Sequence, residues 1–455
     1  MGEQALSGSP AGAGAPDEAD VVGQLPPAPL PGAPDGTALE EALARRFLRY
    51  SAIPSQSDAS RTELPTSEGQ RELARLLATE LTAAGAADVH LSETSVLTAR
   101  VRATDPSAPA IGFCTHLDTV DSGLSPVVRA RVVDYDGVSH GGDLIQDAVT
   151  GAAIRLAEHP ELSRYAGQRI LVADGTSVLG ADDKAGVSTV MQLACDLLAA
   201  DASGSGEPHG EVVVSFVPDE EIGLRGVRTM DLARFDVEWA YTLDSCEIGE
   251  VVEETFNAAT CTLRVSGVAT HPMSGKGVLV NPILIASELI ARLDPLETPE
   301  HTEDREGYVW VHDVVGDQST CTLTISVRDH ERAGYEEKKA RLQRIVEEVA
   351  AAHPRAGLEL VIDDVYANLA DARTPENEHA LAHVYTALDR LGIAPIPLAM
   401  RGGTDGSWLS TQGVFTPNVF TGAHNFHSAA ELLPLPSFAA SYRVCRELIR
   451  LAAGR

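Results

Sequence analysis

Apolar, strand-like runs end in acidic or histidine residues at several widely separated places in this 455-residue chain. In an open parallel sheet, the carboxyl ends of the strands line one crevice, and ligands bind there. Residues that are distant in the sequence can therefore converge on one site. Four such segments are residues 114–118, 218–221, 241–244 and 424–427, and a fifth acidic cluster, residues 180–184, opens a predicted helix. This pattern predicts an α/β fold with a ligand site at one edge of its sheet.

The alternation of apolar runs with helical patterns supports this fold class. Strands are predicted at 110–114, 170–173, 211–217, 239–243 and 416–421. Helices are predicted at 38–50, from 67 to about 84, and at 184–200. Ser67 is the expected cap of the second helix, with Gln70 as its capping-box partner. From about Thr255 the pattern becomes strand, helix, strand, helix, strand until the chain returns to the first sheet near Arg373. We therefore expect a small α+β domain inserted into a larger α/β domain.

Length and composition limit the classes of protein that this chain can belong to. Its length exceeds one ordinary core, so two domains are expected. Residues 1–37 are rich in Pro, Gly and Ala, which predicts a disordered tail without a secretory leader. No apolar run is long enough to span a bilayer, and the net charge of −31 argues against nucleic acid and anionic membranes as partners. Six cysteines without a CxxC pair indicate a cytoplasmic protein.

Histidine and carboxylate side chains without a thiolate form the ligand set of a hydrolytic zinc or a similar divalent metal. His116 and Asp118 lie two residues apart at the end of a predicted strand, so their side chains can face the same way. This spacing suits a metal ligand and a carboxylate that orients it, although it also fits a surface pair. Asp182 and Asp183 open a predicted helix, where a carboxylate can either bind a metal or simply cap the helix.

More acidic residues and a histidine follow the other predicted strands. Glu220 and Glu221 are adjacent at the end of a core strand, so they repel each other and need a cation or a raised pKa. A metal ligand beside a general base meets both needs. Asp244 and His427 close strands in the same manner. Asp182, Glu221 and Asp244, with a bridging hydroxide, would balance the charge of two divalent ions, so we expect two metals rather than one.

Two further residues are candidates with open alternatives. His271 precedes a proline, and Arg401 opens a glycine-rich segment, 401–406. An ordinary surface loop and an ordinary turn explain these segments equally well.

Several longer motifs carry a resemblance to a known family. They are residues 116–119 (HLDT), 179–186 (LGADDKAG), 218–223 (PDEEIG), 239–244 (WAYTLD), 256–259 (FNAA), 271–272 (HP) and 401–406 (RGGTDG). At these motifs the chain resembles the M20 family of dizinc metallopeptidases, and within it the tripeptide aminopeptidases of the peptidase T group. The resemblance extends from about Leu39 to the C-terminus.

The resemblance implies a role for each candidate residue. One zinc ion would be held by His116, Asp182 and Asp244, and the other by Asp182, Glu221 and His427, with Asp182 bridging. Asp118 would orient His116, and Glu220 would be the general base. His271 would help to hold the carbonyl oxygen in the transition state, and Arg401 and Asn281 would lie near the substrate. A cis peptide bond between Asp182 and Asp183 is also implied.

The resemblance further implies a fold and a reaction. The fold is a mixed-sheet catalytic domain of the zinc-aminopeptidase type with helices on both faces, formed by residues 38–254 and 372–455. Residues 255–371 would form an inserted lid domain, through which many relatives form homodimers. The reaction is hydrolysis of the N-terminal peptide bond of short peptides, with tripeptides expected, by a hydroxide that bridges the two metals.

Two other functions are compatible with the same residues. One is an N-acyl amino acid deacylase or carboxypeptidase of the M20 family, which would use the same dizinc core. The other is a peptide-binding protein with a vestigial site, although every expected ligand is present. The chain also departs from the peptidase T pattern after His427, where Ser428, Ala429 and Ala430 replace Gly, Lys and His. This departure leaves the preferred side chains and peptide length open.

Overall fold

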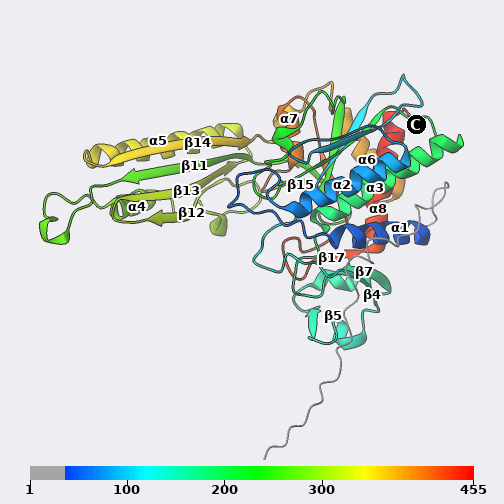
Figure 1. The fold of residues 1–455 in the computed structure, drawn as a ribbon, viewed down its shortest axis with the longest axis horizontal. Helices are drawn as coiled ribbons and strands as arrows, with labels where there is room; N and C mark the ends of the chain where they lie inside the picture. The colour runs from blue at the N-terminus through cyan, green and yellow to red at the C-terminus, as the bar shows by residue number, and fades with distance from the viewer. Residues whose placement is uncertain (1–35) are drawn as a thin grey trace, which may run out of the picture. The chain divides into compact units, whose positions relative to one another are not determined.

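The computed structural model describes residues 36–455 (Figure 1). The predicted tail, residues 1–37, lies outside the described residues except for its last two, which begin helix α1 (Gly36–Ser51). Among the described residues, every helix falls short of the length and apolarity that a membrane span requires. All six cysteines are free thiols.

An eight-stranded mixed sheet forms the centre of the larger domain. Its strands, in spatial order, are β1 (Ala87–Leu91), β2 (Leu97–Val101), β8 (Val212–Val217), β3 (Ile111–His116), β9 (Trp239–Ser245), β16 (Asn418–Phe420), β10 (Glu250–Glu254) and β15 (Ile396–Ala399). Strands β8, β3, β9 and β16 are parallel neighbours. Strands β3 and β8 are buried along their whole length, which explains their continuous apolar sequences. The mixed sheet predicted for this domain is confirmed.

Helices cover both faces of this sheet. Helices α1, α2 (Glu68–Ala84), α3 (Ala181–Ser203), α6 (His379–Leu391) and α8 (Leu435–Ala452) share one large apolar core with one face. In Figure 1, α2, α3 and α8 lie next to one another, and the packing between α2 and α3 and between α3 and α8 agrees with this view. Helix α7 (Asp405–Thr411) packs on the other face, where Leu409 joins Cys114, Val213 and Phe235 in a separate apolar cluster.

The capping box predicted for α2 is wrong. Ser67 occupies the N-cap position but makes no hydrogen bond to the helix backbone. The Gln70 side chain instead donates to Ser67 Oγ at 3.1 Å and to the Asp219 carboxylate at 2.7 Å. The amide is therefore used to tie the start of α2 to the end of β8.

Two small sheets lie outside the main one. Strands β17 (Leu432–Pro434), β7 (Gln168–Val172) and β4 (Arg131–Tyr135) form an antiparallel sheet, and β5 (Leu144–Asp147) pairs with β6 (Ala152–Ile154). The apolar run predicted at 170–173 is thus a strand, but it belongs to this small sheet rather than to the main one. Gln146 and Glu161 of this region hold the loop that carries His427, because they bond Ala429 O at 2.7 Å and Asn425 Nδ2 at 2.9 Å.

The inserted region is a four-stranded antiparallel sheet with two helices. Its strands, in spatial order, are β12 (Tyr308–Gly316), β13 (Thr320–Asp329), β11 (Asn257–Ser266) and β14 (Gly357–Tyr366). Helices α4 (Pro282–Ile290) and α5 (Arg332–Ala352) share an apolar core with one face of this sheet (Figure 1). The expected strand–helix order is present, with β12 as an additional edge strand. Within residues 36–455, the short 3-10 helices are Ser139–Gly142, Pro160–Tyr165, Val227–Thr229, Pro272–Ser274, Pro299–His301 and Leu369–Ala372.

The two chain segments that lead into and out of this region are joined by hydrogen bonds. The Thr255 N–H donates to Asn368 Oδ1 at 2.9 Å, and the Leu369 N–H donates to Thr255 Oγ1 at 3.0 Å. The Asn368 N–H donates to Asn257 Oδ1 at 3.2 Å. Asn257 begins β11, whereas Thr255 and Asn368 lie just outside β11 and β14. All three are near the predicted domain limits at 255 and 371, which stay a prediction.

Candidate active site

Four predicted site residues lie at the carboxyl ends of neighbouring strands. His116 is the last residue of β3, and Asp244 is the last residue but one of β9. Glu220 and Glu221 follow β8. Because β8, β3 and β9 are adjacent and parallel, these ends meet at the same edge of the sheet. The structure therefore brings together residues that are far apart in the sequence.

Asp182 lies between two histidines. Its Oδ1 is 2.8 Å from His116 Nε2, and its Oδ2 is 2.9 Å from His427 Nε2. His427 Nε2 also lies 3.0 Å from Glu221 Oε1. The peptide bond between Asp182 and Asp183 is cis, which confirms the expectation drawn from the family resemblance.

The negative charges of the clustered carboxylates exceed the positive charges of the side chains around them. Burial, together with the neighbouring carboxylate of Asp244, raises the pKa of Glu220, and burial with Asp182 raises the pKa of Asp244. Burial and Asp182 also raise the pKa of Glu221 to about 7. Burial would lower the pKa of His427, but hydrogen bonds to Asp182 and Glu221 raise it to about 11. Carboxylates under such repulsion are stabilised by a bound cation.

The donor set fits divalent metal ions. Ligand atoms of His116, Asp182 and Glu221 lie within 4.8 Å of one another, and the same holds for His116, Glu220 and Asp244. Imidazole nitrogen and carboxylate oxygen are ligands that zinc and related ions accept. His427 is 46% exposed, so the cluster is open to solvent on its side.

Asp118 supports the loop that follows β8. Its two carboxylate oxygens accept hydrogen bonds from the backbone N–H groups of Glu220, at 3.0 Å, and Glu221, at 3.2 Å. His116 Nδ1 faces Asp118, at 3.1 Å from its backbone carbonyl and 3.4 Å from its carboxylate. Asp118 is fully buried, so these contacts fix both the imidazole and the two glutamates.

Three buried acidic residues support the site in ways that the sequence analysis missed. Asp183 accepts from the N–H groups of His116 and Gly186 at 3.1 and 3.0 Å. Asp219 accepts from the Thr66 N–H at 2.9 Å and adopts a φ of 56°, which aims the next two glutamates. Asp183 lies in the LGADDKAG motif and Asp219 in the PDEEIG motif, and these positions could have identified both residues from the sequence.

Glu431 is the third missed residue. Its carboxylate accepts from the N–H groups of Gly180, Ala181 and Asp182 at 2.8, 2.7 and 3.2 Å, and only 1% of the residue is exposed. A carboxylate is favoured there because the first N–H groups of a helix lack partners. Glu431 follows His427 by four residues and thus links the two chain segments that carry His427 and Asp182. An acidic residue directly before the apolar strand β17 was the available signal.

Replacing Glu431 by Gln should weaken metal binding, because the amide turns an N–H donor toward the backbone donors of α3. Losses of about 10–100-fold in metal affinity are typical for residues that support metal ligands. Competition with a chromogenic chelator would measure the loss. The matched control is Glu80→Gln. The Glu80 carboxylate is also largely shielded from solvent, but it accepts hydrogen bonds from the side chains of Arg46 and Tyr50 rather than from the backbone of α3. Equal metal affinity in the Glu431 variant and the wild type would contradict this role.

Three predicted residues lie apart from the cluster. His271 is exposed, and its Nδ1 accepts from the Met273 N–H at 3.2 Å. Asn281 caps α4 by accepting from the Ile283 N–H at 3.0 Å. Within residues 36–455, neither side chain bonds to the acidic cluster.

Arg401 lies at the junction with the inserted region. It donates to the backbone carbonyls of Asp304 and Glu306, at 3.2 and 2.7 Å, and stacks near the rings of Phe256 and Tyr308. These contacts connect the glycine-rich segment after β15 to the inserted sheet, and none of them reaches the acidic cluster.

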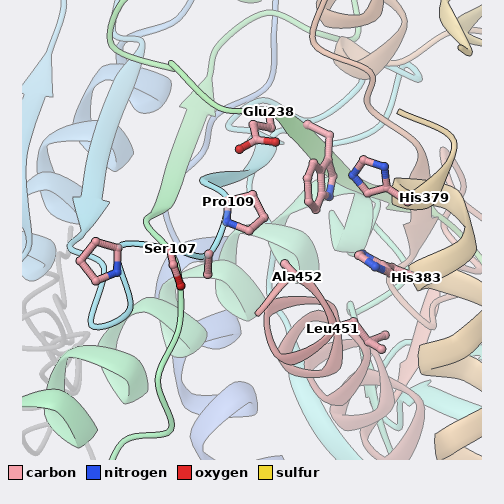
Figure 2. A pocket seen from close by; sticks show the side chains of 10 residues that line it. Ser107, Pro109, Glu238, His379, His383, Leu451 and Ala452 are labelled. Carbon is pink, nitrogen blue, oxygen red and sulfur yellow. The ribbon is translucent and has the colours of Figure 1, made fainter. Parts of the chain in front are cut away.

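A separate depression of about 510 Å³ lies at the opposite end of β9 (Figure 2). Its lining includes Glu238 and Trp239 at the start of that strand and His379 and His383 on α6. The Trp239 ring packs edge-on against His379, with 4.4 Å between ring centres. Because Asp244 lies at the other end of the same strand, this depression is distinct from the acidic cluster.

Comparison with known proteins finds relatives that match along most of the chain. The model of the M20 peptidase dimerisation domain matches residues 254–355. A peptidase T-like protein of Yersinia pestis is 48% identical over 416 residues, which are 91% of this chain and 99% of that protein. Peptidase T of Geobacillus kaustophilus is 36% identical over 415 residues, 91% of this chain and 98% of that protein. The crystal structure of the aminopeptidase PepT from Bacillus cereus shares the fold, with a TM-score of 0.68, 19% identity, and coverage of 91% of this chain and 99% of that one.

The agreement extends over nearly the whole length of both relatives, and the fold and the sequence motifs point to the same group. This chain therefore belongs to the peptidase T group of the M20 metallopeptidase family.

Proposed function

We propose that this protein is an aminopeptidase that removes the N-terminal residue of short peptides, with tripeptides as the preferred length. The observation that carries the proposal is the convergence of His116, Asp182, Glu221 and His427, with Glu220 buried beside them. Hydrolysis of an amide needs an activated water, a proton acceptor and a group that stabilises the oxyanion. This cluster contains residue types suited to the first two tasks.

Two divalent ions, most simply Zn²⁺, would be held by these residues. We assign His116, Asp182 and Asp244 to one ion and Asp182, Glu221 and His427 to the other, with Asp182 shared. The 2.8 and 2.9 Å contacts of Asp182 to both histidines support the shared role. Such ions lower the pKa of a bound water and polarise the scissile carbonyl.

Glu220 would accept the proton of the attacking water and then deliver it to the leaving amine. Its backbone N–H donates to the Asp118 carboxylate, which holds the Glu220 side chain beside the proposed metal ligands. Asp118 would keep His116 and the glutamate loop in place. The proposed proton transfer needs no further proton acceptor or donor from the chain.

The three residues outside the cluster would act on the substrate. His271 is exposed on the inserted region, so it is free to donate to the carbonyl oxygen when this region closes over the site. Arg401 and Asn281 would contact the peptide near the junction and near α4. Their present hydrogen bonds to backbone groups would have to be shared with, or exchanged for, the substrate.

A free tripeptide and its N-acetylated form should be cleaved very differently. An aminopeptidase that recognises the free amine should hydrolyse the first and reject the second, because the blocked nitrogen carries no charge. Release of amino acids, measured by chromatography, gives both rates on metal-loaded protein. Turnover should stop with a chelator and return with Zn²⁺, Co²⁺ or Mn²⁺. Cleavage of the acetylated substrate instead would favour the alternative, an M20 deacylase or carboxypeptidase, and no cleavage of di-, tri- or tetrapeptides would refute the proposal.

We also infer that the inserted region forms a homodimer interface. The match to a dimerisation domain covers 254–355, and Leu284, Leu296 and Val315 in this range are 64–68% exposed. Exposed apolar side chains of this kind are typical of association surfaces. Light scattering after gel filtration should give twice the chain mass of 48.0 kDa. A mass of one chain at micromolar concentration would contradict the dimer.

A further inference from the structure

A second cavity, of about 270 Å³, lies between helices α3 and α8. The loop of residues 205–209 also lines it. Its position is far from the catalytic cluster, because Asp182 lies in the first turn of α3 whereas the cavity lies along the second half of that helix. At a rise of about 1.5 Å per residue, the 14 residues from Asp182 to Asp196 span roughly 21 Å.

One wall of the cavity is apolar. Leu193, Leu197 and Ala200 project from α3 with helical spacing, and Ile449 faces them from α8. Residues at positions i, i+4 and i+7 share one face of a helix, so the wall is continuous. Such a surface suits an aliphatic group.

Two opposite charges line the same cavity without pairing. Arg446 and Asp196 both line the cavity but form no ion pair, so their charged atoms are more than 4.0 Å apart. Among the described residues, Arg446 makes no ion pair with any other carboxylate either. Its neighbour Arg450 also lines the cavity but is paired with Glu207 at 2.8 Å and with Glu447 at 2.7 Å.

Asp196 is oriented by its neighbours and still has acceptor capacity. Tyr442 Oη donates to its Oδ2 at 2.6 Å, and Gln192 Nε2 donates to its Oδ1 at 2.8 Å. A carboxylate has about four acceptor positions, so each oxygen can accept a further hydrogen bond. Burial raises the pKa of Asp196, although these two hydrogen bonds and the positive charges of Arg46 and Arg446 act in the opposite direction.

We propose that this cavity binds a free α-amino acid with an aliphatic side chain. The carboxylate of the ligand would bind Arg446, its ammonium group would bind Asp196, and its side chain would contact Leu193, Leu197 and Ile449. The volume is below the usual range of about 300–1,000 Å³ for drug-sized ligands, so it suits one small zwitterion rather than a peptide. Free amino acids are what a peptidase releases, but binding here does not depend on the proposed catalytic activity.

Calorimetric titration of the full-length protein with L-leucine tests the site. We expect saturable binding that Arg446→Gln weakens at least tenfold, while Arg450→Gln, which removes a paired arginine of the same helix, leaves it nearly unchanged. Binding of 4-methylpentanoate, which lacks the ammonium group, and of 3-methylbutylamine, which lacks the carboxylate, should be at least tenfold weaker than that of leucine. Tripeptide turnover and metal content should be the same in both arginine variants and the wild type, so failure here leaves the proposed function untouched.

A crystal soaked in L-selenomethionine locates the ligand independently of any variant. The expected result is an anomalous selenium peak between α3 and α8. Selenium found solely beside the catalytic cluster, no binding of leucine, or leucine binding that Arg446→Gln does not change would each overturn the proposal.

Discussion

Replacing Glu220 by Ala should lower kcat on a tripeptide by roughly 10²–10⁴-fold, the usual contribution of a positioned general base. The reason is that no other carboxylate is free to take the proton of the attacking water, since Asp182, Glu221 and Asp244 are assigned to the metal ions. KM should change little, because Glu220 binds neither end of the peptide. Steady-state kinetics on metal-loaded protein would give both constants, and mass spectrometry of the metals should still find two ions per chain.

The neighbouring substitution Glu221→Ala is the matched comparison. Glu221 lies 3.0 Å from His427 and is assigned to a metal ion, so its loss should reduce metal content as well as turnover. The contrast is decisive because Glu220 also shares a close group of possible ligand atoms with His116 and Asp244. Loss of metal from the Glu220 variant would make that residue a ligand and remove it as the base.

Replacing Asp182 by Asn should abolish both metal binding and activity. The Asp182 carboxylate reaches both histidines, so its two oxygens are the shared link between the two proposed ions. An amide offers only one acceptor atom and no negative charge. The loss of activity should therefore exceed the ~100-fold effect that removal of a supporting residue produces. Metal analysis and tripeptide turnover on the same preparation would measure it.

Asp201→Asn provides the control for this variant. Asp201 lies near the end of the same helix and is 3.2 Å from His209, so it tests whether any loss of charge on α3 disturbs the site. The control should keep two ions and normal turnover. An Asp182 variant that retains two ions and cleaves tripeptides would show that the carboxylate is not shared.

The main sheet and the cluster of acidic and histidine residues were predictable because short sequence patterns indicate both of them. A continuous apolar run that is followed by an acidic residue marks both a buried parallel strand and its functional end, and His116, Glu221 and Asp244 all occur in this context. The edge strand β12 was missed although its Val and aromatic content was visible, because Val314 and Val315 are exposed and give no alternation of polar and apolar residues.

Contacts across long sequence separations could not be predicted from such patterns. Glu431 bonds to the N–H of Gly180, 251 residues away, and Gln70 bonds to Asp219, 149 residues away. Gln70 also shows why the capping box failed, since its Oε1, which a capping box needs as the acceptor for the Ser67 N–H, accepts instead from the Asp219 N–H at 2.9 Å. The assignment of β7 to a small sheet likewise depends on its pairing with β4 and β17, which no local pattern encodes.

The hydrogen bonds among Thr255, Asn257 and Asn368 hold the entrance and the exit of the inserted region side by side. Strand pairing continues this adjacency, because Ala258 lies opposite Tyr366. A module attached in this way can be excised at the genetic level and its flanks rejoined by a short turn without stretching the remaining polypeptide. The same geometry allows evolution to lengthen, exchange or delete the module while the metal-binding body keeps its connectivity.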